Sequence, residues 1–171
     1  MKYYIRQNAL YLFSFIVLFL LMAGEISAQT NRQSSEEFTK MKQLLSSRNF
    51  VFEADRMLPQ SGASKMLTST YTLKVTDTTA KAHLPYYGVA YSNIKYGGNG
   101  GVSFDGKMLE YSQEIKEKKE RILVKFRIHG DNNLYMCSLN VTKSGSATLH
   151  IIPDNRQSIS YWGDIKQIEE D

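Results

Sequence analysis

Apolar and polar residues alternate with a period of two along most of the chain. The clearest example is residues 122–129, where the apolar positions are Ile122, Val124, Phe126 and Ile128. Alternation of this kind is typical of a β-strand with one buried side and one side in water. We therefore expect these four side chains to face the core, with Lys125 and Arg127 outward.

Similar segments recur at short intervals and are separated by turn residues. They cover residues 50–54, 71–76, 81–92, 102–104, 108–115, 135–141, 147–151 and 159–163. Asp105-Gly106 is a typical two-residue hairpin turn and predicts that one strand ends and another begins there. In all, the pattern predicts about eight strands in an antiparallel meander. Such a meander must cover its apolar side by closing into a barrel or folding as a sandwich.

One segment near the start follows a helical period instead. Ser34 or Ser35 can cap a helix there, and Glu36 and Glu37 would stabilise its first turn. Apolar residues then recur at helical spacing at positions 38, 41, 44 and 45. We expect a single amphipathic helix over residues 36–47, which could plug one end of the β-structure or cover a gap in it.

The first 28 residues have the layout of a secretory signal peptide. Lys2 and Arg6 precede an almost wholly apolar run over residues 9–23, and small residues follow up to Ala28. The apolar run is shorter than the roughly 20 residues that a membrane-spanning helix needs. We expect cleavage after Ala28, a loose segment at 29–35 and one β-barrel-like domain at 36–171. The product would be periplasmic or extracellular, with no stable membrane insertion.

The charge of the chain argues against nucleic acid as a partner. Without the leader's two basic residues and one acidic residue, 19 of 21 basic and 16 of 17 acidic residues remain, a formal charge of +3. The densest basic run, residues 116–121, is interrupted by Glu117 and Glu120. This mixed run predicts a solvated hairpin turn. A nucleic-acid-binding protein would instead be expected to show a basic stripe with aromatic platforms.

The residues that most often carry catalysis form no recognisable constellation. The lone cysteine, Cys137, cannot make an internal disulfide, and its place in a strand pattern predicts a small buried hydrophobe. His129 and His150 fall in the polar phase of separate strands, which is unfavourable for a shared zinc site. We therefore expect no catalytic residue, no metal site and no cofactor.

Aromatic residues provide the best candidate for a binding site. Tyr86 and Tyr87 are adjacent, so in an extended strand one would point inward and the other outward. Tyrosine combines a flat apolar body with a polar tip, which suits ligand contacts, but alternating tyrosines are also ordinary strand formers. The residues that we expect to line a shallow site are Tyr86, Tyr87, Tyr91, Tyr96 and Trp162.

Several of these landmarks occur together in one known family. Residues 50–54 (FVFEA), 84–88 (LPYYG), 101–104 (GVSF) and 159–163 (ISYWG) follow one another behind a leader and a short helix. In this order the chain resembles the domain-of-unknown-function family 4251, small exported proteins of Gram-negative gut bacteria. The resemblance implies a lipocalin-like β-barrel or half-open sandwich and implies no activity, so it transfers no site residues.

Two functional classes remain open on this evidence. The first is a non-enzymatic module that binds a small apolar or glycan-like ligand. The second is a structural or protein-interaction component of the cell envelope, which would pair through an exposed strand edge or an aromatic patch.

The leader generates the first testable prediction. N-terminal sequencing of the exported protein should begin at Gln29, because the small residues before it form the expected cleavage site. Exported material that begins at Met1 would contradict the prediction.

Overall fold

The structure, a computed structural model, describes residues 36–89, 100–130 and 133–168. The chain divides into two compact units, Met1–Glu37 and Phe38–Asp171. The expected leader and the expected loose segment at 29–35 lie outside the described residues. The strands, and all but the first two described helical residues, belong to the second unit.

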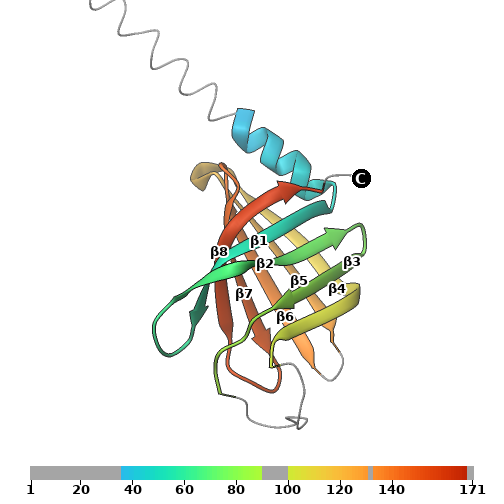
Figure 1. The fold of residues 1–171 in the computed structure, drawn as a ribbon. Coiled ribbons are helices and arrows are strands. Elements are labelled where there is room, and N and C mark those ends of the chain that lie inside the picture. Colours follow the sequence, from blue (N-terminus) through green and yellow to red (C-terminus); the bar gives the residue numbers. More distant parts are fainter. Residues whose placement is uncertain (1–35, 90–99, 131–132, 169–171) are drawn as a thin grey trace, which may run out of the picture. The chain divides into compact units, whose positions relative to one another are not determined.

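Eight antiparallel strands form a closed barrel in which each strand pairs with its neighbours in chain order (Figure 1). The strands are β1 (Asn49–Pro59), β2 (Lys65–Thr76), β3 (Thr79–Leu84), β4 (Val102–Lys116), β5 (Arg121–His129), β6 (Leu134–Thr142), β7 (Ser146–Pro153) and β8 (Ile159–Gln167). A short 3-10 turn, η1 (Glu117–Lys119), joins β4 to β5. The predicted mainly-β fold, an antiparallel meander closed as a barrel, is confirmed.

Pairing of the first strand with the last closes the barrel. β1 and β8 are antiparallel, with Ala54 opposite Gly163, and the register shifts between Ala54 and Arg56. At this point the two backbones approach so closely that a Cβ atom on Gly163 would lie 1.8 Å from the carbonyl oxygen of Glu53. Only glycine leaves room for this approach.

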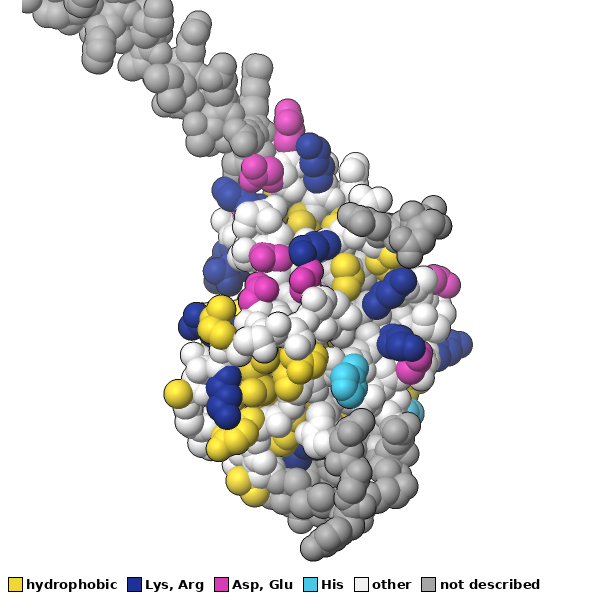
Figure 2. Space-filling view, viewed as in Figure 1, with side chains coloured by type: hydrophobic (Ala, Val, Ile, Leu, Met, Phe, Trp, Pro, Cys, Tyr) yellow, Lys and Arg dark blue, Asp and Glu magenta, His cyan; other side chains and the backbone are white. Residues whose placement is uncertain are grey.

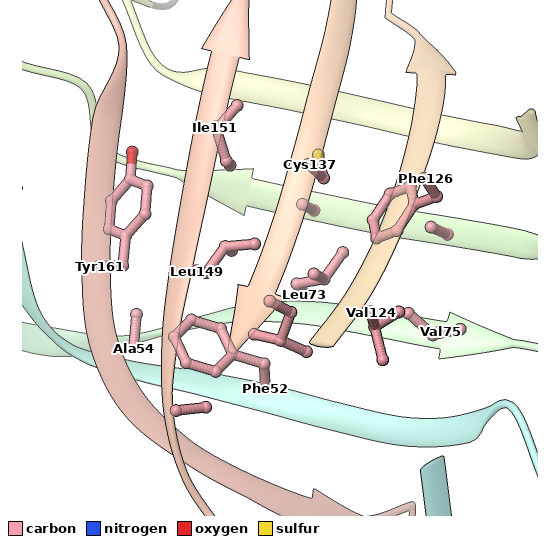
Figure 3. Packing of buried hydrophobic residues seen from close by; sticks show 14 of the residues in the cluster. Phe52, Ala54, Leu73, Val75, Val124, Phe126, Cys137, Leu149, Ile151 and Tyr161 are labelled. Carbon is pink, nitrogen blue, oxygen red and sulfur yellow. The ribbon is translucent and has the colours of Figure 1, made fainter. Parts of the chain in front are cut away.

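Apolar side chains from all eight strands occupy the interior, and among the described residues no polar or charged side chain is buried. Figure 3 shows members of this core, including Phe52, Leu73 and Leu149, directed into the barrel. The predicted inward side of β5 is confirmed, because its four apolar members are buried. Lys125 is exposed and Arg127 is partly exposed on the other side.

A helix over residues 36–46 precedes the strands, as predicted. Two of its apolar residues, Phe38 and Leu45, are buried in the barrel core, and Met41 and Leu44 pack against that core. Lys42 forms an ion pair of 3.1 Å with Glu117 of η1. The helix therefore packs against the end of the barrel at which β4 turns into β5.

The predicted hairpin turn at Asp105-Gly106 is wrong, because both residues lie inside the long strand β4. The first part of β4, up to Lys107, pairs with β3, and the part from Met108 onward pairs with β5. Gly106 pairs with Ala80 of β3, two residues before Met108 begins the pairing with β5. Local turn chemistry was thus overridden by the strand pairing of the barrel.

The buried side of β5 gives a stability prediction. Phe126→Ala should lower the free energy of unfolding by about 3–5 kcal/mol, because the ring is almost fully buried and its loss leaves a cavity. The matched control, Lys125→Ala on the exposed side, should change it by no more than about 0.5 kcal/mol. Chemical denaturation measures both, and equal losses in the two variants would contradict the prediction.

Candidate functional site

The predicted site residues are divided between two regions of the structure. Tyr86 and Tyr87 follow β3 directly, in a connector that is not a strand, since β3 ends at Leu84 and Pro85 comes next. Trp162 lies on β8, where the residue is 49% exposed and the guanidinium of Arg56 lies 5.8 Å from the ring centroid. Tyr91 and Tyr96 lie outside the described residues.

Tyr86 is a structural residue of the connector. Its ring is partly buried against the core. Its hydroxyl lies 3.0 Å from the carbonyl oxygen of Gln157 and 3.3 Å from that of Val89, so it can donate its proton to either. Arg156 stacks over the ring at 4.8 Å. These contacts fasten the connector to the turn between β7 and β8.

Two further contacts hold the same two segments together. The backbone N–H of Gln157 donates to the carbonyl of Val89 at 3.1 Å, and the N–H of Val89 donates to the Gln157 side-chain oxygen at 3.2 Å. Gly88 lies against the Tyr86 ring, since a Cβ atom there would be 2.6 Å from the hydroxyl oxygen.

Tyr161 supports this region from inside the barrel. Its ring is fully buried, and its hydroxyl donates to the carbonyl of Pro85 at 2.6 Å. Burial raises the pKa of this hydroxyl above its ordinary value, so it remains protonated and can act as a donor. The sequence analysis missed this role. Tyr161 alternates in phase with Ile159, and this pattern indicates a side chain that faces the core. The pattern does not indicate that its hydroxyl binds the carbonyl of Pro85.

Tyr87 has the opposite character, because 54% of its surface is exposed. The ammonium nitrogen of Lys65, the first residue of β2, lies 3.7 Å from the centroid of its ring. This is a close cation–π contact. Tyr87 therefore joins the connector to the start of β2, and one part of its ring still faces water.

Strand β2 borders this exposed ring because it leaves β3 early. Their pairing ends at Leu73 and Ala82, although both strands continue. Beyond that point Leu67 and Tyr71 of β2 are partly buried against the core, as Tyr86 is. We name this region the tyrosine surface, formed by Lys65, Leu67, Tyr71, Tyr86 and Tyr87. On the face drawn in Figure 2, hydrophobic side chains gather around the start of β2 with a basic side chain among them.

A second exposed apolar group lies on the wall of the barrel. Leu109, Met136 and Ile152 are 38%, 47% and 39% exposed. Strand register places them in one row with Arg127, because Leu109 is opposite Arg127, Arg127 is opposite Met136, and Met136 is opposite Ile152. Sequence analysis missed this row, since each residue falls singly in the polar phase of its own strand.

The titratable groups take local structural roles. Cys137 is buried, and burial raises the pKa of its thiol, which disfavours the thiolate that a nucleophile requires. His150 Nδ1 forms a hydrogen bond of 2.9 Å with the Ser160 hydroxyl. Within the described ranges, no three His, Cys, Asp or Glu side chains are grouped so that they could hold a metal ion.

No helix among the described residues has both the length and the apolar character needed to cross a membrane.

Comparison with known proteins relates the chain to one family. The model of the family described as "Domain of unknown function (DUF4251)" matches residues 32–165. A crystal structure of a DUF4251 family protein from Bacteroides eggerthii has a TM-score of 0.60 and 22% sequence identity, covering 77% of this chain and 87% of that one. At this identity the likeness concerns the fold alone. No curated protein matches the chain.

The different environments of the two tyrosines can be tested by substitution. Tyr86→Phe should lower the free energy of unfolding by about 1 kcal/mol, because it removes the hydroxyl that joins the connector to the β7–β8 turn. Tyr87→Ala should change it by no more than about 0.5 kcal/mol, since the ring is largely exposed. Thermal or chemical denaturation would contradict this assignment if Tyr87→Ala were the more damaging change.

Proposed function

The chain belongs to the DUF4251 family of domains of unknown function, and we propose that it is an exported, non-enzymatic module that binds a small apolar or glycan-like ligand at the tyrosine surface. The observation that carries the proposal is the exposed ring of Tyr87 beside the ammonium group of Lys65.

The chemistry of this pair suits such a ligand. The ring of Tyr87 offers a flat apolar body on which the apolar side of a sugar ring or an aliphatic chain can pack. The ammonium group of Lys65 lies over one face of that ring and supplies up to three N–H donors, which can reach hydroxyl or carboxylate oxygens of the ligand. Aromatic and apolar side chains with a few polar groups beside them are the usual composition of a ligand site.

The packing of the barrel interior favours a ligand site on the outer surface of the protein. Apolar side chains from every strand meet there, and the hydroxyl of Tyr161 is already used by the carbonyl of Pro85. The contacts of Tyr86 hold the connector in place behind Tyr87. The platform is therefore supported before a ligand arrives, which lowers the entropic cost of binding.

The proposal is tested with defined probes and a matched variant pair. The protein is titrated with a panel of soluble oligosaccharides and with the apolar dye anilinonaphthalene sulfonate, and binding is followed by NMR and fluorescence. We expect at least one probe to shift the signals of Tyr87 and Lys65. Tyr87→Ala should weaken that binding by about tenfold or more, as loss of a central tyrosine does at interfaces.

The control is Met136→Ala, which removes a side chain of similar exposure from β6, four strands away from β2 in the barrel. It should leave probe binding unchanged. If no probe binds, or if both variants weaken binding equally, the tyrosine surface is not the binding site.

A second candidate is a protein-interaction component of the envelope, which the row of Leu109, Met136 and Ile152 favours. Neighbouring exposed apolar side chains on one sheet surface are typical of protein contacts. A photo-crosslinking residue at position 136 should then give a discrete protein adduct in the native envelope. The same photo-crosslinking residue at position 140, two outward-facing rows away on β6, should give none.

A further inference from the structure

The positive charge of Lys65 is not paired with any carboxylate among the described residues. Other exposed lysines have such a partner, as Lys81 does in Asp105 at 2.7 Å. The ammonium group of Lys65 instead lies 3.7 Å from the centroid of the Tyr87 ring. Lys65 is itself exposed, so its N–H groups are accessible to a ligand.

The segments that border this pair contain no acidic residue. They are β2 with the turn before it, the connector after β3, and most of the turn between β7 and β8. Asp and Glu are absent from residues 57–76, 78–104 and 155–163. The chain around Lys65 therefore offers the ammonium group no carboxylate of its own.

The acidic residues just beyond these segments do not neutralise Lys65 either. Asp77 follows the end of β2 that lies farthest from Lys65. Asp154 is held by its backbone N–H, which donates to a carbonyl at the start of β6 at 3.1 Å. Asp55 lies two residues along β1 from Met57, the register partner of Lys65. None of these three described carboxylates forms an ion pair with it.

The position of the ammonium group also constrains the shape of the ligand. Because it lies so close to an exposed ring, an anionic group bound to it would bring its neighbouring atoms onto or beside Tyr87. A cation–π contact at an exposed site is weak, so the ammonium group can turn toward a ligand and uncover the ring. The site therefore suits a negative charge attached directly to an apolar or ring-shaped body.

A single ammonium group matches a carboxylate better than a phosphate. A phosphate carries up to two charges and is typically bound by guanidinium groups or by several cations. The next cation, Arg156, stacks on Tyr86 and directs its Nη1 to the carbonyl oxygens of Gly100 and Gly101, at 3.2 and 3.3 Å. Its guanidinium is thus engaged in holding the connector.

We propose that the ligand of the tyrosine surface bears a carboxylate, which pairs with Lys65 while the body attached to it packs on Tyr87. This inference rests on the proposed function, because it specifies the ligand class of the same site. Acidic sugars and aliphatic acids both carry this chemistry.

Matched pairs of probes test the proposal. Each pair is an acid and its primary amide, which has nearly the same shape without the charge. One pair is built on a trimer of galacturonic acid and the other on octanoic acid, and NMR titration gives each dissociation constant. At low ionic strength the acid of at least one pair should bind about fivefold or more tightly than its amide. The preference should shrink in about 0.5 M NaCl, because salt screens an exposed ion pair.

Variants of Lys65 assign the preference to this residue. Lys65→Gln should bring the acid and the amide to within about twofold of each other, because the charge is lost. Lys65→Arg should retain the preference, because it keeps the charge. The matched control is Lys74→Gln, which removes an exposed lysine near the other end of β2 and changes the net charge equally. It should leave the preference unchanged.

The outcomes separate this inference from the proposed function. Acid and amide that bind equally well at Tyr87, or neutral probes that bind where neither acid does, would overturn the inference and leave the proposed function standing. An acid preference that survives Lys65→Gln would overturn it too. If no acidic or neutral probe binds, both fail. The pair that shows the preference distinguishes an acidic sugar from an aliphatic acid.

Discussion

The pairing of β1 with β8 is the constraint on which the rest of this structure depends. An eight-stranded meander that is not closed leaves two edges and one apolar face in water. Closure here requires the backbones to meet at Gly163, where a Cβ atom would overlap the carbonyl of Glu53. Once the ring is closed, every strand has an inside, and the alternating apolar residues acquire a common core.

The two ends of the barrel are covered in different ways. At one end the helix over residues 36–46 contributes Phe38 and Leu45 to the core, and Lys42 pairs with Glu117. At the other end the connector after β3 is held by its own Tyr86 and by Tyr161 of β8. The first end is covered by a dedicated element, whereas the second leaves an aromatic ring exposed at Tyr87.

The early separation of β2 from β3 produces the ligand platform proposed at Tyr87. Because the two strands part after Leu73 and Ala82, the start of β2 reaches the connector and brings Lys65 onto Tyr87. Further along β2, the register with β1 shifts between Ala54 and Arg56, and Thr68, Ser69 and Thr70 are exposed at this shift. The proposed ligand platform is thus a consequence of a departure from ideal barrel pairing.

The sequence by itself determined the strand number, the buried phase of β5 and the N-terminal helix, because periodicity records which side of an element is apolar. It also indicated that Tyr86 and Tyr87 would lie in different environments. It did not determine that Asp105-Gly106 lies within β4, because the choice between a turn and a continuous strand depended on the neighbours β3 and β5.

Only the tertiary structure decided which residues meet. Trp162 was grouped with the tyrosines from the sequence, yet it lies on β8, two strands from Lys65, and contacts Arg56. Conversely, Lys65 and Tyr161 carried no local signal for the site, since their partners Tyr87 and Pro85 are far away in the chain. The period of a strand assigns each side chain to a face, but strand register and closure assign its neighbours, and these are long-range properties of the fold.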